Sequence, residues 1–533
     1  MEPTISPLER ARLSYRPVLP AVLEAGLAAI TPAEISGGGG GDDSAIREAF
    51  PGLAGASAVR FEPASNGAPA GPLKVGVVLS GGQAPGGHNV IVGLHDALTT
   101  SNPESCVIGF LGGPRGIFND NHRVLSAGEI DAHRNTGGFD LIGSGRDKIE
   151  TAKQLEACRA TCERLGLDGL VVIGGDDSNT NAAVLAQYFV EHGQPTVVVG
   201  APKTIDGDLK GGGIEASFGF DTATKVYSEL IGNIERDARS AKKYWHFIKL
   251  MGRSASHVTL ECALATRPNV ALIGEEVRLR NWTLEQVTDH IVDVVRRRAE
   301  AGKHYGVCLV PEGLIEFIPE AGTLIAELNV LLADGGETDG LAERLTPADS
   351  AAFSRLPERI QSQLLLDRDS HGNVQVSRID TEALLVETVA TKLGRGKFQT
   401  HFFGYEGRCA APSNFDANYT AAIGRTAAAL VAHGKTGYIC CVGNLAAGPT
   451  SWTAGGIPIT SLMRMETRKG KPTPVIAKAL VDLVGAPFNA FDAGRGAWGI
   501  DDAYVYPGPI QYFGPDDIAD RTTVTLQLES GQS

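Results

Sequence analysis

The strongest constraint on the fold lies in residues 174–210, where two short apolar runs each lead into a pair of aspartates. The first run, LVVIGG, precedes Asp176–Asp177, and the second, TVVVGAPK, ends shortly before Asp206–Asp208. A helical pattern separates them, and a strand–helix–strand unit with a right-handed crossover makes its two strands parallel. Both acidic loops then open at the carboxyl end of one sheet, where α/β proteins bind ligands.

The residue types in these loops indicate phosphate chemistry. The second loop carries Lys203, and glycines accompany both pairs of aspartates. Carboxylates bind hard cations such as Mg²⁺, and a lysine with nearby backbone amides binds phosphate oxygens. Aspartate is also favoured as a helix cap and in Asx turns. For Asp208 this purely structural interpretation stays open beside the functional one.

A glycine-rich turn, SGGQAPGG, follows the strand pattern at residues 74–79 and leads into a predicted helix from about His88 to Leu98. Its backbone amides and the helix amino terminus could bind an anion. The turn lacks the closing Lys-Ser/Thr of a P-loop and does not match GxGxxG, which disfavours a dinucleotide. Arg146 ends another glycine-rich loop. Two interpretations of Arg146 stay open, a phosphate ligand and a solvated surface arginine.

Three further strand patterns end in residues suited to ligand binding. Arg253 follows the strand pattern at 244–250, Glu312 follows that at 304–310, and the sequence FFGYEGR ends in Arg408. Arginine binds phosphate through two parallel hydrogen bonds. Tyr405 and Arg408 are three residues apart, so on a helical turn they would share a face.

Strand and helix patterns alternate from residue 74 to 311, which predicts parallel α/β layers. A chain of 533 residues has room for two to four domains. We expect two α/β lobes, a charged helical insertion at about 320–395 and a late helix from Val475 to Leu483. The predicted divisions are an amino-terminal extension at 1–70 with a flexible Gly37–Gly41 linker, a first lobe at 71–220 to which about 410–470 return, a second lobe at 221–400 and a carboxyl-terminal segment at 471–533 that packs on the core.

Composition excludes several partners and compartments. A formal net charge of −14 argues against nucleic acid or an anionic membrane surface as the main partner. No apolar run approaches the roughly 18–20 residues of a membrane helix, and the amino terminus has no signal-peptide pattern. The eight cysteines form no CxxC pair, which favours reduced thiols in a cytoplasmic protein.

Six motifs occur in the order found in one family, and they read GGQAPGGHN, GGDDSNTNA, PKTIDGDLK, KYWHFIKLMGR, PEG and YEGR. From about residue 71 to 530 the chain resembles the phosphofructokinases. It is most similar to their long pyrophosphate-dependent branch, which includes the catalytic β subunit of the plant enzyme. No motif position departs from the family pattern. The resemblance implies an α/β fold with two Rossmann-like parallel-sheet domains, a helical insertion and an amino-terminal extension.

The resemblance also implies a reaction: reversible, Mg²⁺-dependent transfer of a phosphoryl group from pyrophosphate to the 1-hydroxyl of fructose 6-phosphate. The first lobe would bind the phosphoryl donor and the second the sugar phosphate. By motif position, Asp206 would be the general base, Asp176 the Mg²⁺ ligand and Gly82 a pyrophosphate contact. The residues implied to bind the sugar phosphate are Thr204, Ile205, Asp206, Met251, Gly252, Arg253, Glu312, Tyr405, Glu406, Gly407 and Arg408, with Lys243 and Tyr244 reaching the sugar of a neighbouring subunit.

Asp177 and Lys203 bear on the choice of donor, because ATP-dependent relatives carry glycine at both places. A carboxylate at 177 would repel the α-phosphate of a nucleotide, whereas Lys203 could bind pyrophosphate and stabilise the transition state. Two alternatives remain, an ATP-dependent enzyme of the same fold and a non-catalytic regulatory subunit. A subunit-shared sugar site implies a homodimer or higher oligomer, with which a regulatory subunit could associate.

Overall fold

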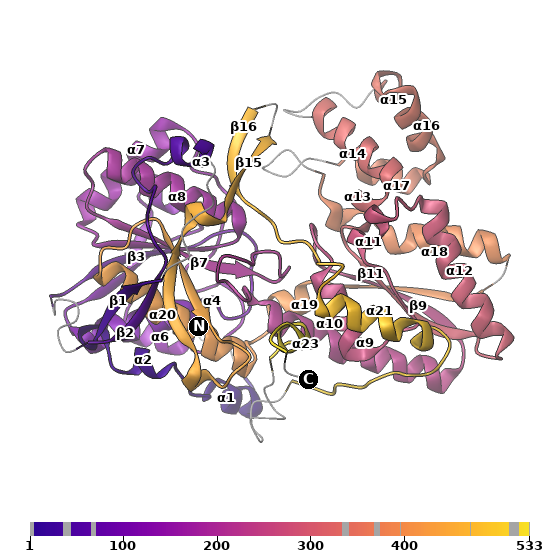
Figure 1. The fold of residues 1–533 in the computed structure, drawn as a ribbon, viewed down its shortest axis with the longest axis horizontal. Helices are drawn as coiled ribbons and strands as arrows, with labels where there is room; N and C mark the ends of the chain where they lie inside the picture. Colours follow the sequence, from indigo (N-terminus) through magenta and orange to yellow (C-terminus); the bar gives the residue numbers. More distant parts are fainter. Residues whose placement is uncertain are drawn as a thin grey trace. The chain divides into compact units, whose positions relative to one another are not determined.

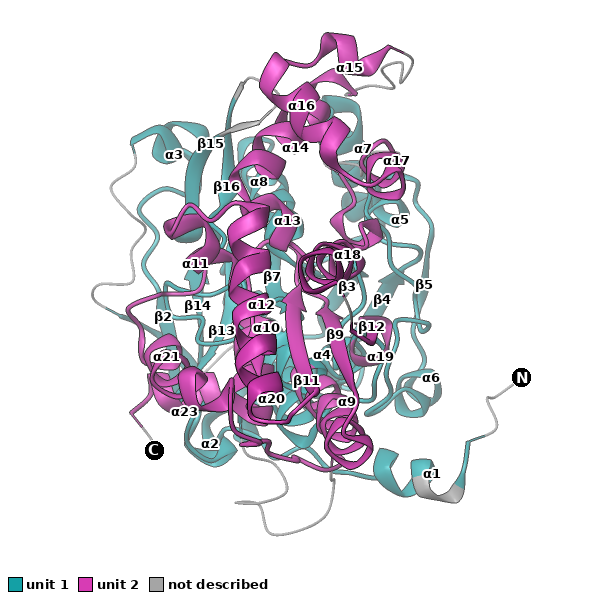
Figure 2. Cartoon of the chain, turned by 90° about the vertical axis from the view of Figure 1, so that its right-hand side faces the viewer, with its two compact units in different colours: residues 1–223, 408–479, 511–522 teal, residues 224–407, 480–510, 523–533 magenta. Residues whose placement is uncertain are grey.

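The computed structural model describes residues 5–35, 44–64, 71–332, 340–366, 374–394, 396–468, 471–510 and 522–531. The predicted linker at Gly37–Gly41 lies outside these residues. The chain forms two compact units, coloured separately in Figure 2. Unit 1 comprises residues 1–223, 408–479 and 511–522, and unit 2 comprises 224–407, 480–510 and 523–533.

The sheet of unit 1 contains ten strands among the described residues, in the order β1-β2-β14-β13-β7-β6-β3-β4-β5, with β8 paired to β7. Its centre, from β13 to β4, is parallel, and its two margins are antiparallel. The strands are β1 Ile30–Glu34, β2 Val59–Pro63, β3 Lys74–Leu79, β4 Cys106–Phe110, β5 His122–Val124, β6 Gly169–Gly174, β7 Val197–Thr204, β8 Phe218–Gly219, β13 Tyr438–Gly443 and β14 Thr453–Pro458.

Helices cover both faces of this sheet. Helices α7 (Ala152–Leu165) and α8 (Asp176–Glu191) lie on one face, and α4 (Gly87–Ser101) and α20 (Asn414–Ala432) lie on the other (Figure 1). Helices α4 and α20 meet backbone to backbone, because a Cβ added to Gly424 would lie 2.1 Å from the carbonyl oxygen of Val90. The shorter helices of unit 1 are α1 Pro7–Leu13, α2 Ala21–Glu24, α3 Ser44–Ala49, α5 Arg115–Phe118 and α6 Ala127–Ala132.

Unit 2 is built on a smaller sheet that is parallel throughout, in the order β10-β11-β9-β12. Its strands are β9 Tyr244–Leu250, β10 Val270–Ala271, β11 Tyr305–Pro311 and β12 Phe398–Phe403. Its helices are α9 Phe220–Ala241 from residue 224 onward, α10 His257–Thr266, α11 Gly274–Leu279, α12 Leu284–Glu300, α13 Leu314–Phe317, α14 Pro319–Leu331, α15 Leu341–Arg344, α16 Pro347–Arg355, α17 Glu358–Leu364, α18 Thr381–Leu393, α21 Ala486–Trp498 and α23 Val524–Glu529. Helices α14 to α18 share one apolar core with the sheet, so these helices belong to the packed body of unit 2.

The expectation of two parallel α/β sheets is confirmed, and β6, α8 and β7 form the predicted strand–helix–strand unit. The predicted helix from Val475 to Leu483 is wrong. Residues 471–476 form strand β16, which pairs with β15 (Met463–Arg468), and the next helix is α21. Pro472 and Pro474 favour extended backbone at the residues before them, which starts a strand rather than a helix.

The amino-terminal segment contributes structure that the sequence did not indicate. Strand β2 pairs with β14, and β1 pairs with β2, so this segment extends the sheet of unit 1. No helix among the described residues is long and apolar enough to cross a membrane.

Candidate active site

Three neighbouring strands of unit 1 end in register and bring their loops to one edge of the sheet. Leu79 of β3 pairs with Ile173 of β6, and Gly174 pairs with Pro202 of β7. The glycine-rich turn, the Asp176–Asp177 pair and the loop beginning at Lys203 therefore emerge side by side. The hydroxyl of Ser178 donates to that of Ser80 at 2.8 Å, which joins the first two loops.

Lys203 lies at the centre of this edge. Its side chain is buried, and its ammonium group donates a hydrogen bond to the carbonyl oxygen of Gly82 at 2.7 Å. Burial lowers the pKa of Lys203 to about 8, and the positive charge of Arg408 acts in the same direction. A buried cation held beside another cation is stabilised by an incoming anion.

Two guanidinium groups join Lys203 around Gly82. A Cβ added to Gly82 would lie 3.4 Å from Cζ of Arg408 and 3.5 Å from Nη2 of Arg146. The backbone at Gly82 therefore lies beside three positive charges. Arg146 therefore faces the glycine-rich turn, which favours the interpretation of Arg146 as a phosphate ligand. The arrangement suits an anion with several phosphoryl oxygens.

Carboxylates also lie near Lys203, because Asp206 and Asp176 both raise its pKa. The buried Oδ2 of Asp176 accepts no hydrogen bond, and its ion-pair partner is Nζ of Lys478 at 3.7 Å. Burial raises the pKa of Asp208 to about 7, and the negative charges of Asp206 and Asp176 raise it further. This surplus of negative charge is what a divalent cation would neutralise.

The donor set fits Mg²⁺ in its usual protein setting. Among the described residues, no group of three or more His, Cys, Asp or Glu side chains is arranged as a complete metal site. Magnesium is commonly held by one or two carboxylates, with substrate phosphates and water completing its shell. Asp176, with an oxygen that lacks a hydrogen-bond donor, is suited to be such a ligand.

The remaining predicted residues of this edge have defined positions. Ile205 is buried, and the backbone N–H of Asp206 donates to Oγ1 of Thr204 at 3.1 Å, which shapes a tight turn. Gly207 completes the turn with a φ of +74°, a value that favours glycine. Asp177 occupies the first turn of α8, where the helix dipole attracts negative charge.

The sheet of unit 2 aligns its strand ends in the same way. Leu250 of β9 pairs with both Pro311 of β11 and Phe403 of β12, so the residues after these strands lie together. The backbone N–H of Gly252 donates to Oε2 of the buried Glu312 at 3.1 Å. This bond ties the Met251-Gly252-Arg253 loop to the end of β11.

The YEGR motif forms the single helical turn α19, Tyr405–Arg408, as expected from its spacing. The carboxylate of Glu406 accepts the backbone N–H of Gly404 at 2.8 Å, and Gly404 O accepts the hydroxyl of Tyr227 at 2.6 Å. A Cβ on Gly407 would lie 2.7 Å from the Tyr227 ring, so this position requires glycine. Glu406 and Gly407 thus hold the turn, and Tyr405 remains 66% exposed.

Lys243 and Tyr244 lie elsewhere in unit 2. Tyr244 begins strand β9, whereas Met251 follows its end, and seven residues of strand span roughly 20 Å. Tyr244 also has a φ of +72°, which is strained for an aromatic residue. The structure therefore does not bring this pair to the edge that holds Arg253.

Sequence reasoning missed Lys478 as a contributor to the carboxylate cluster, and it left Arg146 undecided. The glycine-rich loop before Arg146 was a usable signal. For Lys478 there was none, because its proximity to Asp176 depends on contact between α8 and strand β16, far along the chain.

Comparisons with known proteins agree with this geometry. The family model described as phosphofructokinase matches residues 74–431. A pyrophosphate–fructose 6-phosphate 1-phosphotransferase of Treponema pallidum is 50% identical, covering 99% of this chain and 97% of that protein. The β subunit of the enzyme of that name from Solanum tuberosum is 51% identical (99% and 94%), and its α subunit is 40% identical (98% and 89%).

Solved structures support the fold. A pyrophosphate-dependent phosphofructokinase from Marinobacter aquaeolei matches with a TM-score of 0.56 at 17% identity, covering 81% of this chain and 93% of that one. One from Nitrosospira multiformis matches with a TM-score of 0.56 at 16% identity, covering 85% and 96%. With two α/β units built on largely parallel sheets and a family match over residues 74–431, this chain belongs to the phosphofructokinase family.

Proposed function

We propose that this protein transfers a phosphoryl group reversibly from pyrophosphate to the 1-hydroxyl of fructose 6-phosphate, giving fructose 1,6-bisphosphate and phosphate. The observation that carries the proposal is the buried Lys203 beside Gly82, with Arg146 and Arg408 converging on the same glycine. The positive charges of these three side chains suit the negative charge of pyrophosphate. Relatives that are about 50% identical over nearly the whole chain carry the name of this activity.

In the donor half of the site, Gly82 and Lys203 bind pyrophosphate, with Arg146 as an added contact. Lys203 also stabilises the charge that develops on the departing phosphate. Such electrostatic stabilisation of the transition state supplies much of the rate acceleration of phosphoryl-transfer enzymes, because the transferring group spreads its charge over its oxygens.

In the sugar half, fructose 6-phosphate is bound by the strand-end residues that the family motifs mark. They are Thr204, Ile205, Asp206, Met251, Gly252, Arg253, Glu312, Tyr405, Glu406, Gly407 and Arg408. Lys243 and Tyr244 reach the sugar phosphate of a neighbouring subunit. Their position at the opposite end of β9, and the strained backbone of Tyr244, support a role outside their own subunit's site.

In the reaction, the carboxylate of Asp206 accepts the proton of the 1-hydroxyl, and the sugar oxygen attacks the nearer phosphorus of pyrophosphate. The bond from that phosphorus to the bridging oxygen breaks, and the ammonium of Lys203 neutralises the leaving phosphate. In the reverse direction, protonated Asp206 returns its proton. Asp176 would hold Mg²⁺, which supplies charge neutralisation at the phosphate oxygens when bound.

The shared sugar site makes the working protein a homodimer or a higher oligomer. We also propose an association with a regulatory subunit, which is supported by the separately named α and β subunits of the potato relative. We place the protein in the cytoplasm because all eight cysteines are free thiols.

The function is tested with purified protein, fructose 6-phosphate and Mg²⁺, by measuring fructose 1,6-bisphosphate formed with either pyrophosphate or ATP. We expect turnover with pyrophosphate, a rate with ATP that is lower by at least about a hundredfold, and loss of activity in EDTA that Mg²⁺ restores. Comparable rates with ATP would overturn the proposed donor. No turnover with either donor would point instead to a regulatory subunit.

The lowered pKa of Lys203 predicts a pH dependence. Because the ammonium form is present below a pKa of about 8 in the free protein, kcat/KM for pyrophosphate should decline as the pH rises through 8. An unperturbed lysine would keep its charge to beyond pH ~10. The measurement is a pH profile from 7 to 9.5 for wild type and Lys203→Met. The variant should lack this decline, and an identical decline in both proteins would refute the assignment.

Replacing Gly313 by alanine should impair sugar binding. A Cβ at this position would lie 1.8 Å from the carbonyl oxygen of Arg253, so the Arg253 loop must move. Displacements of about 1 Å in a site can cost roughly 10²-fold in rate. We expect kcat/KM for fructose 6-phosphate to fall by about that factor. Gly496→Ala is the matched control, because nothing lies within 4 Å of its added Cβ. Equal effects of the two variants would contradict the prediction.

A further inference from the structure

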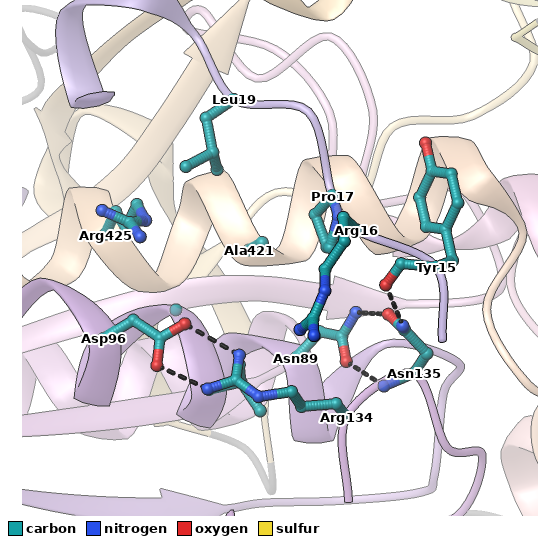
Figure 3. A pocket seen from close by; sticks show the side chains of 12 residues that line it. Tyr15, Arg16, Pro17, Leu19, Asn89, Asp96, Arg134, Asn135, Ala421 and Arg425 are labelled. Atoms are coloured by element: carbon teal, nitrogen blue, oxygen red, sulfur yellow. Dashed lines mark hydrogen bonds and ion pairs between the residues drawn. The ribbon is translucent and has the colours of Figure 1, made fainter. Parts of the chain in front are cut away.

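A cavity of about 160 Å³ lies in unit 1 beneath the amino-terminal segment Tyr15–Leu19. Helices α4 and α20 form its floor, and the segment after α6 forms one wall (Figure 3). None of its lining residues belongs to the site described above. The cavity is thus separate from the donor and sugar residues and needs its own explanation.

The charged side chains that line the cavity are three arginines and one aspartate: Arg16, Arg134, Arg425 and Asp96. Arg134 and Asp96 neutralise each other through two hydrogen bonds, of 2.7 and 2.8 Å. Arg134 also binds Asp131 outside the cavity at 2.7 Å. Arg16 and Arg425 bring the lining to three positive charges against one negative charge, and Asp131 and Glu24 act on it from outside.

These two arginines lack partners. Among the described residues, neither Arg16 nor Arg425 makes a hydrogen bond or an ion pair within 4 Å. Arg425 is half-buried, and burial lowers its pKa; Asp96 raises this pKa, Arg134 lowers it and Glu24 raises it. Figure 3 shows Arg16 reaching from the amino-terminal segment toward Asn89 and Arg134, while Arg425 projects from α20 above Asp96. A half-buried guanidinium that makes no direct hydrogen bond keeps its N–H donors available for an anion beside it.

The walls of the cavity are fixed by amide side chains. Buried Asn135 is paired with Asn89 through two hydrogen bonds, of 2.7 and 2.8 Å, and donates to the carbonyl oxygen of Tyr15 at 2.7 Å. From α20, Oδ1 of Asn418 accepts the backbone N–H of Val18 at 2.7 Å. The segment that carries Arg16 is therefore held over the helices before any ligand arrives, which reduces the entropy cost of binding.

We propose that this cavity is a second anion site, which binds a small molecule bearing a phosphate group. A doubly charged phosphate matches the two unpaired guanidinium groups, which recognise its oxygens through paired hydrogen bonds. The volume corresponds to roughly five water molecules at about 30 Å³ each, enough for phosphate or a three-carbon phosphoester and too little for a nucleotide. The ligand would also bridge the amino-terminal segment to α20.

The test measures how many phosphate ions each chain binds, by equilibrium dialysis with radiolabelled inorganic phosphate. Relative to wild type, Arg16→Gln/Arg425→Gln should bind one phosphate fewer per chain, while turnover at saturating substrates is retained. Arg10→Gln, an exposed arginine of α1, is the matched control and should lose none. Displacement by glycerol 3-phosphate would identify a phosphoester as the ligand, and displacement by unlabelled phosphate alone would identify the free ion.

A second measurement tests the proposal with a single variant, in case the double variant does not fold. Arg16 is exposed, so Arg16→Gln alone leaves the packed core intact. Phosphate should slow hydrogen exchange of residues 13–19 in wild type, and Arg16→Gln should require roughly tenfold more phosphate for the same protection. Two results would overturn the proposal. One is an unchanged phosphate stoichiometry in the double variant, and the other is protection of residues 13–19 at the same phosphate concentration in wild type and Arg16→Gln.

Discussion

Replacing Asp206 by asparagine should lower the rate of fructose 1,6-bisphosphate formation from pyrophosphate by about 10²–10⁴-fold, the usual contribution of a positioned general base. Asparagine has nearly the same size as aspartate but cannot accept the proton of the sugar hydroxyl. The turn itself should survive, because it is held by the backbone N–H of residue 206 and Oγ1 of Thr204. The loss should therefore fall on kcat, with KM for fructose 6-phosphate changed only a few-fold.

Asp208→Asn is the matched control within the same loop. Burial raises the pKa of Asp208 to about 7, so this carboxyl holds a proton more readily than an ordinary aspartate and loses less charge on substitution. Its backbone oxygen, which accepts the N–H of Ala479 at 2.8 Å, is unaffected by the substitution. We expect a loss below about tenfold. If Asp208→Asn costs as much as Asp206→Asn in a direct product assay, the assignment of Asp206 as the base is wrong.

The parts of the fold that the sequence predicted are those determined by short-range patterns. Strand β6, helix α8 and strand β7 follow one another without interruption, and the handedness of the crossover leaves one arrangement. Once β3, β6 and β7 are parallel neighbours, their loops must meet at one edge. For this reason the sequence pattern placed Asp176 and Lys203 at one edge of a sheet, whereas Gly82 was assigned to the same ligand only through the family resemblance.

The parts that escaped prediction depend on partners far away in the sequence. Strand β2 pairs with β14, where Arg60 lies opposite Gly455, about 395 residues later in the chain. Strands at the margin of a sheet also have weak local signals. The apolar run at 475–483 resembled a helix, yet β15 supplies its first residues with backbone hydrogen bonds. Lys478 comes to Asp176 for the same reason, and no local pattern marks it.

Donor choice should change when Asp177 is replaced by glycine. Asp177 lies in the first turn of α8, and a helix amino terminus otherwise attracts phosphate. A carboxylate in this place itself interacts with the helix amino terminus, and its negative charge repels the α-phosphate of a nucleotide. Asp177→Gly should therefore gain measurable ATP-dependent turnover.

Lys203→Met should lower the rate of turnover with pyrophosphate by about 10²–10³-fold, because it removes a cation that stabilises the transition state.

Asp177→Asn separates the two contributions to donor choice, since it removes the charge while keeping the size. If repulsion excludes ATP, both Asp177→Asn and Asp177→Gly should gain ATP use in the same product assay; if bulk excludes it, only the glycine variant should. The glycine variant also carries a helix cost of about 1 kcal/mol, so its melting temperature must be compared with that of Asp177→Asn before rates are interpreted. Both variants retain the Lys203–Gly82 contact and should keep most pyrophosphate turnover. Variants that stay folded, lose pyrophosphate activity and gain none with ATP would show that Asp177 acts in catalysis rather than in selecting the donor.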